Sequence, residues 1–340
     1  YYECMSVLGL ETSCDETSVA LVEDGRTVLS CEIVSSLAEF EKKGGVIPEY
    51  AARAQVSAVI PVLSRALKAA SIDMRDIDLI AVTRGPGLLG SLLVGTVTAR
   101  VLSEVFSIPL IAVHHTHGHL SSPWLCDALD ASPPRFPALT LSVSGGHTDL
   151  WLRASHCDNT LLGSTLDDAA GEAFDKGASL LGLPYPGGPS LAQFSLSGNE
   201  DAYAFPSPLE RSHSLDFSFS GLKTSLKYVL RDLGTRADLP SVAASYQLAI
   251  CNHLVSRLQM ALERHSSVHD VHVVGGVAAN SRLRALLTER LPSSIALRYP
   301  HSRYCTDNGA MIAASGYFQW MSGVRTPSFV TETTLSSITR

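Results

Sequence analysis

Short apolar runs separated by polar turns occupy the first part of the chain. Residues 7–24 predict a strand, a small polar turn and a second strand, and residues 25–36 predict a third. Apolar residues then recur at three- and four-residue spacing over residues 49–70, which predicts a helix. The pattern continues with a strand, a glycine turn that opens a long apolar helix, and another strand, at residues 78–85, 85–106 and 108–113.

The second half of the chain shows a similar order of predicted strands and helices, which indicates a weak internal duplication. A strand, the turn SGGHT, two more strands and a helix are predicted over residues 136–154, 159–168 and 168–182. A loop-rich stretch follows from Leu183 to Gly221. Helices come next, then a strand, a Gly-Gly turn and a helix over residues 271–291, and a polar turn that opens a last helix over residues 304–320. Strands that alternate with helices predict an α/β fold with largely parallel sheets, in two similar lobes facing a cleft.

Composition sets the class of protein. A chain of 340 residues with 45% apolar content can bury a large core, and its length favours about two domains. We find no run approaching the ~20 apolar residues of a membrane span, so we predict no membrane segment. The first residues lack the pattern of a secretory signal, although a targeting peptide that has been removed stays an alternative.

The cysteines and the net charge indicate the redox compartment and how the chain could bind nucleic acid. The seven cysteines are scattered and include no C-x-x-C pair, which argues against a disulfide framework or a zinc ribbon and favours a reducing compartment. The net charge of −7 provides no general attraction to nucleic acid, so binding of nucleic acid needs a local basic patch or a partner. Candidate contacts to a phosphate backbone are Lys42, Lys43, Arg53, Arg84 and Lys223, although scattered basic residues are usually just solvated.

Four histidines lie within HHTHGH, directly after the strand predicted at residues 108–113. His115 and His119 are four residues apart, so on a helix they share a face and their imidazoles can reach one metal ion. His114 sits at the strand end and His117 points elsewhere. A role in helix capping and packing is the alternative for this stretch.

Asp307, in CTDNGAMIA, is placed near the start of the last predicted helix. The usual role of Asp or Asn at such a position is to cap the helix. The alternative is a third metal ligand, because two imidazoles and one carboxylate with open positions suit iron, zinc or manganese.

Three glycine turns are candidates for nucleotide binding, because each allows close approach of backbone N–H groups to phosphate or ribose: SGGHT, YPGGP and VVGGVAAN. The last one opens a helix, whose positive end favours anions. None matches the P-loop or the dinucleotide pattern. In FDKGA, Asp175 either accepts ribose hydroxyls or forms a solvated salt bridge with Lys176.

Taken together, these segments resemble the tRNA N6-adenosine threonylcarbamoyltransferases, the TsaD family of bacterial and mitochondrial type that was formerly called glycoproteases. The matching segments run in family order: VLGLETSCDETSVAL, GGVIPEYAAR, GPGLLGSLLVG, HHTHGH, SVSGGHT, AGEAFDKGASLLGLPYPGGP, DFSFSGLKT, VVGGVAAN and CTDNGAMIA. The resemblance implies the duplicated two-lobed fold of actin, Hsp70 and sugar kinases. Lobe I is then expected at residues 1–118 plus about 305–330, and lobe II at residues 119–304 with a loop-rich insert at about 183–221.

The resemblance also implies the chemistry and the site. The N6 amine of the adenosine beside the anticodon attacks the carbamoyl carbon of threonylcarbamoyl-AMP, and AMP leaves. One divalent metal ion per subunit, most simply Fe²⁺ with Zn²⁺ or Mn²⁺ as alternatives, is expected on His115, His119 and Asp307. The residues implied to hold the adenylate are Ser142, Val143, Ser144, Gly145, Gly146, Asp175, Gly188 and Asn280.

The same resemblance implies binding partners and a cellular location, and the chain differs from the family pattern at two positions. The expected partners are tRNA, an upstream threonylcarbamoyl-AMP synthase and, in a bacterium, the inactive paralogue TsaB and the ATPase TsaE; a mitochondrial protein would form a homodimer. No membrane is expected, and the location is cytoplasmic, with the mitochondrial matrix as the alternative. His117 stands where the family commonly has Glu, and Gln55 stands where His is common.

Three other functions compete. A metalloprotease would also use paired histidines, but the stretch lacks the Glu of H-E-x-x-H. An ATP-dependent small-molecule kinase of the same fold would need neither histidine. A scaffold without enzymatic activity would tolerate loss of both His115 and His119.

Overall fold

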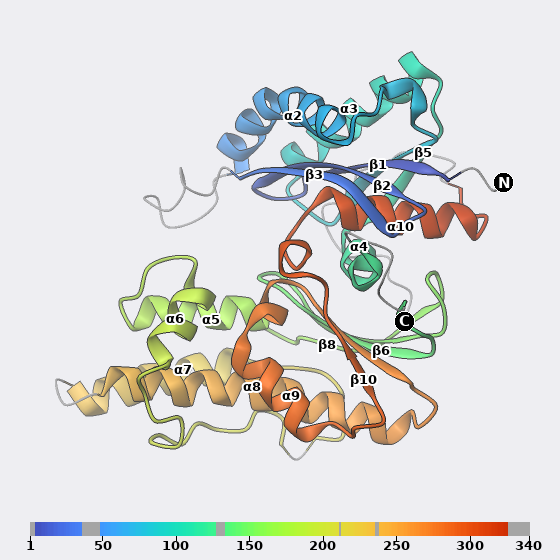
Figure 1. The fold of residues 1–340 in the computed structure, drawn as a ribbon. Helices are drawn as coiled ribbons and strands as arrows, with labels where there is room; N and C mark the ends of the chain where they lie inside the picture. Colours follow the sequence, from blue (N-terminus) through green and yellow to red (C-terminus); the bar gives the residue numbers. More distant parts are fainter. Residues whose placement is uncertain (1–3, 36–47, 127–132, 211, 235–237, 326–340) are drawn as a thin grey trace. The chain divides into compact units, whose positions relative to one another are not determined.

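The computed structural model describes residues 4–35, 48–126, 133–210, 212–234 and 238–325. The chain divides into two compact units, one made of Tyr1–Pro134 with Pro300–Arg340 and the other of Arg135–Tyr299 (Figure 1). Each unit contains one five-stranded mixed sheet with helices packed against it. Lys42 and Lys43, two of the candidate phosphate contacts, lie outside the described residues.

The first unit is built on a sheet with the strand order β3-β2-β1-β4-β5. β1 runs antiparallel to β2 and parallel to β4, and β4 runs parallel to β5. The central strands are buried on both faces, as expected for strands covered by helices on each side. The strands are β1 (Ser6–Glu11), β2 (Glu16–Glu23), β3 (Thr27–Ser35), β4 (Leu79–Gly85) and β5 (Leu110–His114).

Both faces of this sheet carry a hydrophobic core, because successive side chains of a strand point to opposite sides. Val7 belongs to the core that contains α10, whereas the next residue, Leu8, belongs to the core on the side of α2. In Figure 1, α2 and α3 cover one face of the sheet and α10 lies on the other. The helices of this unit are α2 (Pro48–Ala70), α3 (Leu89–Phe106), α4 (His115–Ser121) and α10 (Gly309–Met321).

The second unit repeats the topology of the first. Its sheet has the order β8-β7-β6-β9-β10, with β6 antiparallel to β7 and parallel to β9. The β7–β8 and β9–β10 pairs also match their counterparts. This confirms the internal duplication and the α/β fold class predicted from the sequence. The strands are β6 (Ala138–Val143), β7 (Thr148–Arg153), β8 (Asn159–Ser164), β9 (Asp270–Val274) and β10 (Ala296–Arg298).

The helices of the second unit share one large core with one face of the sheet. Phe174 and Tyr246 are fully buried in it, and the Tyr246 hydroxyl donates to the carbonyl of Ala173 at 3.0 Å. Helix α6 lies inside the stretch predicted to be loop-rich, so that prediction was only partly right. The helices are α5 (Ala170–Leu180), α6 (Gly187–Ser195), α7 (Ser220–Leu233), α8 (Leu239–Arg264) and α9 (Ser281–Arg290).

The boundaries of the two units differ from those expected for the lobes. Along the sequence, the units are divided at residues 134/135 and 299/300. The resemblance placed these divisions at 118/119 and 304/305. Helix α4 runs continuously through residue 118 and packs against α10 and β5 of the first unit. A boundary at 118 would therefore cut a helix whose buried contacts belong to one unit.

Helix α3 is an exception to the prediction that the chain has no segment able to span a membrane. Among the described residues it alone is long and apolar enough to cross a bilayer, with 18 residues and a mean hydropathy of 1.4. Length and composition are weak evidence, since core helices of globular proteins pass the same test. Only 28% of α3 is buried, however, so it leaves an unusually apolar exposed face.

A buried histidine makes the second unit sensitive to acid. The backbone N–H of Ser218 donates to Nε2 of His253 at 3.2 Å, which requires that nitrogen to be unprotonated. Burial, followed by the positive charge of Arg257, lowers the pKa of His253 from 6.5 to about 4. As pH falls from 6.5 towards 4, the unfolded chain therefore binds a proton that the folded chain does not.

We expect the free energy of unfolding to fall in this pH window by about 2–3 kcal/mol through His253 alone. His253→Gln should flatten the dependence between pH 6.5 and 4, measured by urea denaturation at several pH values. The matched control is His269→Gln, which changes an exposed histidine of the same unit. Equal flattening in both variants would exclude His253 as the source.

Candidate metal centre and glycine turns

His115 and His119 lie on the first turns of α4, which begins directly after β5. Their four-residue spacing places both side chains on one face of the helix. The ring centroids are 4.8 Å apart and the ring planes are perpendicular, at 89°. Both histidines are buried. The spacing argument from the sequence is thus confirmed in three dimensions.

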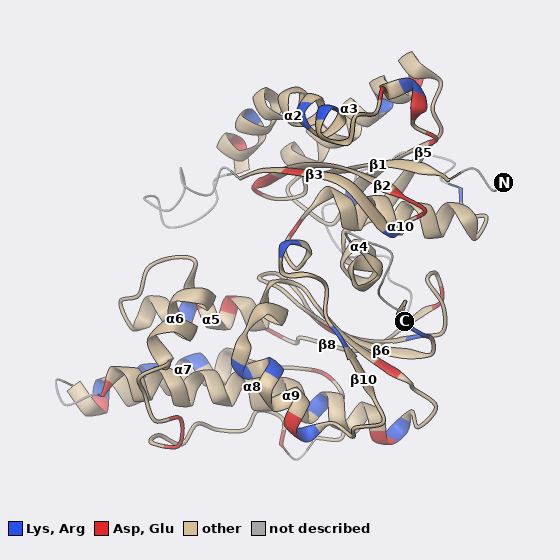
Figure 2. Cartoon of the chain, in the orientation of Figure 1, with Lys and Arg blue, Asp and Glu red and all other residues tan. Residues whose placement is uncertain are grey.

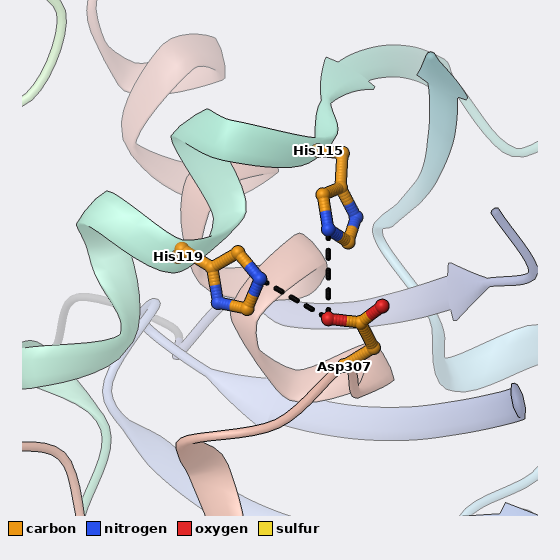
Figure 3. A group of neighbouring side chains, drawn as sticks. All are labelled: His115, His119 and Asp307. Carbon is orange, nitrogen blue, oxygen red and sulfur yellow. Dashed lines mark ion pairs between the residues drawn. The ribbon is translucent and has the colours of Figure 1, made fainter. Parts of the chain in front are cut away.

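Asp307 reaches the two histidines from the segment before α10. Its Oδ1 atom lies 3.1 Å from Nε2 of His119 and 3.5 Å from Nε2 of His115 (Figure 3). The cap of α10 is the neighbouring residue, Asn308, whose side chain accepts the backbone N–H of Met311 at 2.9 Å. The capping role considered for Asp307 therefore belongs to Asn308, and the carboxylate of Asp307 points at the histidines.

Two glycines allow α10 to come close enough for this contact. A Cβ atom on Gly118 of α4 would lie 2.7 Å from Cδ1 of Ile312 in α10. A Cβ atom on Gly9 of β1 would lie 2.7 Å from the backbone nitrogen of Ala313 and closer still to the carbonyl oxygen of Gly309. The absence of side chains at these two positions lets α10 pack directly on β1 and α4, which fixes the position of Asp307.

The three side chains fit a metal ion. Their ligand atoms all lie within 4.8 Å of one another, and a tetrahedral site with bonds of about 2.0 Å has ligands roughly 3.3 Å apart. Among the described residues, neither ring nitrogen of the buried His119 makes a hydrogen bond: Nδ1 has no partner, and the 3.1 Å contact of Nε2 with Oδ1 of Asp307 is an ion pair without hydrogen-bond geometry. A buried imidazole without hydrogen bonds is costly unless another group, such as a metal ion, satisfies it. Two imidazoles and one carboxylate suit Zn²⁺, Fe²⁺ or Mn²⁺.

The surroundings of the triad favour a cation. Burial, followed by the charges of Asp307 and Asp15, raises the pKa of Glu16 from 4.5 to about 9. Burial alone would lower the pKa of His115, but the carboxylates of Asp307 and Glu11 outweigh burial and raise it from 6.5 to about 9. Carboxylates crowded into a buried place thus take up protons, and a bound divalent ion would supply the same positive charge.

His114 and His117 lie outside the triad. His114 is the last residue of β5 and is buried, so it closes the strand as predicted. The His117 ring lies next to that of His114, tilted by 44°, with the centroids 5.2 Å apart. The group of side chains that can hold a metal ion contains His115, His119 and Asp307 and does not contain His117.

Gln55 has a definite structural task. Its buried side-chain amide donates to the backbone carbonyls of Cys14 at 3.0 Å and Glu16 at 2.9 Å, and lies 3.4 Å from that of Thr12. These contacts hold the turn between β1 and β2, which borders the triad. The side-chain amide of Gln55 therefore holds this turn in place. The family commonly has His at this position.

Glu11 is a residue that the sequence did not single out. It ends β1, is almost completely buried and lies 3.1 Å from Nδ1 of His115. A carboxylate at the end of an otherwise apolar strand was the available signal, because buried acidic residues are rare unless they are paired.

In the second unit, two of the glycine turns follow neighbouring parallel strands. Ser142 and Val143 end β6, the turn with Gly145 and Gly146 comes next, and Asn280 follows β9 after a short 3-10 turn (Gly276–Ala279). Since Ser142 pairs with Val274 in register, both turns leave the sheet at the same edge. The carboxyl ends of parallel strands are the usual place for a ligand in α/β sheets.

Helix α5 and the start of α6 are tied to each other and to the first of these turns. The carbonyl of Ser144 accepts the backbone N–H of Gly171 at 3.1 Å. One oxygen of Asp175 accepts the backbone N–H groups of Gly187 at 2.8 Å and Gly188 at 3.2 Å. The YPGGP segment is therefore fixed by Asp175.

Side-chain contacts show how Lys176 and Asn280 are held. Lys176 pairs with Asp168 at 2.8 Å and Glu172 at 2.7 Å, so the salt bridge considered between Asp175 and Lys176 is replaced by these two. Asn280 caps α9 by accepting the backbone N–H of Leu283 at 3.0 Å. All eight residues expected to hold the adenylate lie in the second unit, and their binding role stays a prediction.

Two of the basic residues considered for phosphate contacts are paired with acidic side chains. Lys223 pairs with Asp168 at 3.1 Å, and the exposed Arg53 pairs with Glu49 at 2.7 Å. Figure 2 shows basic positions along α7, which carries Lys223, Lys227 and Arg231 and one acidic residue, Asp232, near its end.

Comparison with known proteins decides the family. A model of the TsaD family, described as tRNA N6-adenosine threonylcarbamoyltransferase, matches residues 27–314. The chain belongs to this family. A tRNA N6-adenosine threonylcarbamoyltransferase of Symbiobacterium thermophilum is 48% identical over 328 residues, covering 94% of this chain and 93% of that protein. One from Syntrophus aciditrophicus is 47% identical, covering 92% and 91%. The protein is therefore an enzyme, an acyltransferase, as the resemblance implied.

Comparison with solved structures supports the fold of this chain. Component A of the (R)-2-hydroxyglutaryl-CoA dehydratase of Acidaminococcus fermentans matches with a TM-score of 0.54 at 16% identity, over 92% of this chain and 98% of that one. HypF of T. kodakarensis matches with a TM-score of 0.63 at 14% identity, over 94% of this chain and 48% of that one. At these identities the likeness concerns the fold alone, and it confirms the duplicated actin-like class.

Proposed function

We propose that the protein transfers the threonylcarbamoyl group of threonylcarbamoyl-AMP to N6 of the adenosine beside the anticodon, in tRNAs that read ANN codons. The observation that supports this most directly is the buried contact of His115 and His119 with Asp307, at 3.5 and 3.1 Å. Membership of the threonylcarbamoyltransferase family supplies the reaction class. The identity of the donor, the set of tRNAs and the dependence on a metal ion are what we propose beyond this class.

The reaction forms one C–N bond and breaks one C–O bond. The lone pair of N6 attacks the carbamoyl carbon, the bond from that carbon to the phosphate oxygen breaks, AMP leaves, and N6 releases a proton. Adenine N6 is a poor nucleophile, so negative charge that develops on the carbamoyl oxygen needs stabilisation. A divalent ion held by His115, His119 and Asp307, Fe²⁺ first with Zn²⁺ or Mn²⁺ as alternatives, would supply positive charge for this purpose.

The chain needs no covalent nucleophile for this chemistry. Cys14 is the cysteine of the turn beside the triad, and burial, followed by the charge of Asp15, raises the pKa of its thiol well above the usual value. A thiol that stays protonated is a weak nucleophile. This supports direct transfer from the adenylate to N6.

The adenylate would be held by backbone and side-chain groups of the second unit. The turn Ser144–Gly146 has open space beside Gly145 and Gly146, as a turn that receives a phosphate requires. Asp175 and Gly188 would contact the ribose from α5 and α6, and Asn280 would contribute from the start of α9, whose N-terminus favours anions. Several of these side chains also hold their own turns, so their variants should be tested for folding as well as for binding.

The deciding experiment is reconstitution. The protein is incubated with unmodified tRNA, threonine, bicarbonate, ATP and a threonylcarbamoyl-AMP synthase, with and without the paralogue TsaB and the ATPase TsaE, and nucleosides are analysed by mass spectrometry. We expect threonylcarbamoyladenosine that depends on this protein. If none forms with any combination of partners, the proposed function is wrong.

Two alternatives give distinct results in the same setting. A metalloprotease would cleave peptides in a metal-dependent manner without tRNA. A small-molecule kinase of the same fold would consume ATP with a sugar or a carboxylic acid and would tolerate loss of both histidines. Neither alternative gains a specific observation from the structure.

We also propose where a protein partner docks. Exposed apolar residues of α2 and α3 form one apolar face: Val56, Ile60, Leu93, Val97 and Val101. All of them except Val101 line a groove between the two helices. Val97 and Val101 are each 55% exposed, which is unusual for a row of apolar residues along one helix. The occupant we propose is the paralogue TsaB that the family resemblance implies, with a second copy of this chain as the other outcome.

Val97→Asp combined with Val101→Asp should weaken binding of that paralogue by at least about tenfold, because two charges would be buried in an apolar interface. Binding is measured by titration calorimetry and the mass of each species by light scattering. Leu196→Asp is the matched control, since Leu196 is 71% exposed on the second unit. Unchanged binding in the double variant would remove this face as the docking site, and a wild-type homodimer broken by the variant would assign it to a second copy.

The location we propose is the cytoplasm of a bacterium, with the mitochondrial matrix as the alternative. In the part of the chain that the structure describes, the scattered cysteines form no disulfide, which suits either reducing compartment. Localisation of a fluorescent fusion in the source cell tests this.

A further inference from the structure

Glu11 lies on the side of His115 that faces away from Asp307. Oε2 of Glu11 is 3.1 Å from Nδ1 of His115, while Nε2 of the same ring is 3.5 Å from Oδ1 of Asp307. The two nitrogens of one imidazole thus face two different carboxylates. The ring is buried, so water does not compete for these positions.

The Glu11 carboxylate is itself held in place. Oε1 accepts the backbone N–H of Ser13 at 2.6 Å, and Oε2 accepts the hydroxyl of Thr83 at 2.6 Å. Ser13 belongs to the turn between β1 and β2, whose carbonyls are fixed by Gln55. Glu11 is therefore a preformed acceptor on a rigid strand end, and it does not depend on the metal ion for its position.

The other histidine lacks such support. Among the described residues, Nδ1 of His119 has no hydrogen-bond partner. A histidine ligand whose second nitrogen donates to a carboxylate is fixed in orientation and becomes a better electron donor. Of the two histidines, only His115 has a carboxylate at that place in the part of the chain described.

We infer that Glu11 is a positioning residue of the metal centre, which accepts the Nδ1 hydrogen of His115 and so keeps the Nε2 lone pair directed at the ion. This inference rests on the proposed metal centre. Glu11 touches neither the ion nor the substrate, and acts only through His115. Loss of such a partner typically weakens metal binding by about 10–100-fold.

The experiment measures metal binding directly. Metal-free protein is titrated with Co²⁺ and with Zn²⁺ in competition with a chelator, and the visible spectrum of the Co²⁺ form reports the ligand geometry. We expect Glu11→Ala to weaken binding by about 10–100-fold and to alter the Co²⁺ spectrum. Glu11→Gln should restore most of the affinity, because its carboxamide oxygen still accepts the Nδ1 hydrogen.

Thr83→Val is the matched control. It removes the hydroxyl that donates to the same oxygen of Glu11, at 2.6 Å, and does not touch His115. Thermal unfolding of the metal-free variants measures how much each change destabilises the fold. We expect Thr83→Val to lose stability but to keep its metal affinity within about threefold.

The outcomes separate the inference from its premise. If the wild-type protein binds neither ion, the proposed metal centre fails, and the inference fails with it. If the wild type binds and Glu11→Ala binds equally well, Glu11 is not a positioning residue and the metal centre stands. If Glu11→Ala and Thr83→Val weaken binding in proportion to their loss of stability, the role of Glu11 is structural only.

Discussion

Replacing His119 by Ala together with Asp307 by Asn should lower threonylcarbamoyl transfer by at least about a thousandfold and abolish stoichiometric metal binding. Both side chains reach one point, with Nε2 and Oδ1 separated by 3.1 Å, so their loss leaves one imidazole to hold the ion. The rate is measured from modified tRNA nucleosides under single-turnover conditions, and metal content is measured by elemental analysis of the purified protein.

The matched control for the double variant is His117→Gln, which changes a histidine of the same helix outside the triad. We expect it to keep both metal content and transfer. If the double variant retained transfer at the wild-type rate, the triad would have no part in catalysis. Because Asn308, rather than Asp307, caps α10, the double variant should fold, and circular dichroism checks this.

Adding a single methyl group at Gly9 should have the largest effect on stability. The Cβ of Gly9→Ala would lie 2.7 Å from the backbone nitrogen of Ala313, and backbone cannot rotate away as a side chain can. Either β1 or α10 must move, which costs about 2–3 kcal/mol of unfolding free energy and displaces Asp307 from the histidines. Denaturant unfolding measures the first effect, and Co²⁺ titration measures the second.

Gly221→Ala is the same change at an open position. Nothing lies within 4 Å of a Cβ atom there, and Gly221 is in the first turn of α7, so we expect a gain of about 0.5–1 kcal/mol. A Gly9→Ala protein as stable as wild type would mean that α10 is not packed closely against β1.

Much of the fold could be predicted from local patterns. The apolar strands and the helix over residues 49–70 are predictable because burial imposes periods of about 2 and about 3.6 residues on the sequence. The pairing of His115 with His119 followed from the same helical period. Asp307 could not be assigned to them in this way, since its position depends on how α10 packs on β1 and α4.

What the sequence missed depends on tertiary contacts. Glu11 and Gln55 act across elements far apart in the chain, and neither has a local pattern that reveals its partner. Asp307 and Asn308 are adjacent, so a shift of one residue in the helix start decides which of them is the cap. Helix ends are the least certain part of any prediction from sequence. The exposed side of α3 was missed because its composition is that of a buried helix.

The matching strand order of the two sheets makes two of their hairpins equivalent. The hairpin between β1 and β2 and the hairpin between β6 and β7 occupy the same place in their sheets. One carries Ser13 and a buried carboxylate next to imidazoles, and the other carries the glycines of SGGHT. In the function that we propose, these equivalent hairpins would thus serve opposite charges, one beside a bound cation and the other beside the phosphate of the adenylate.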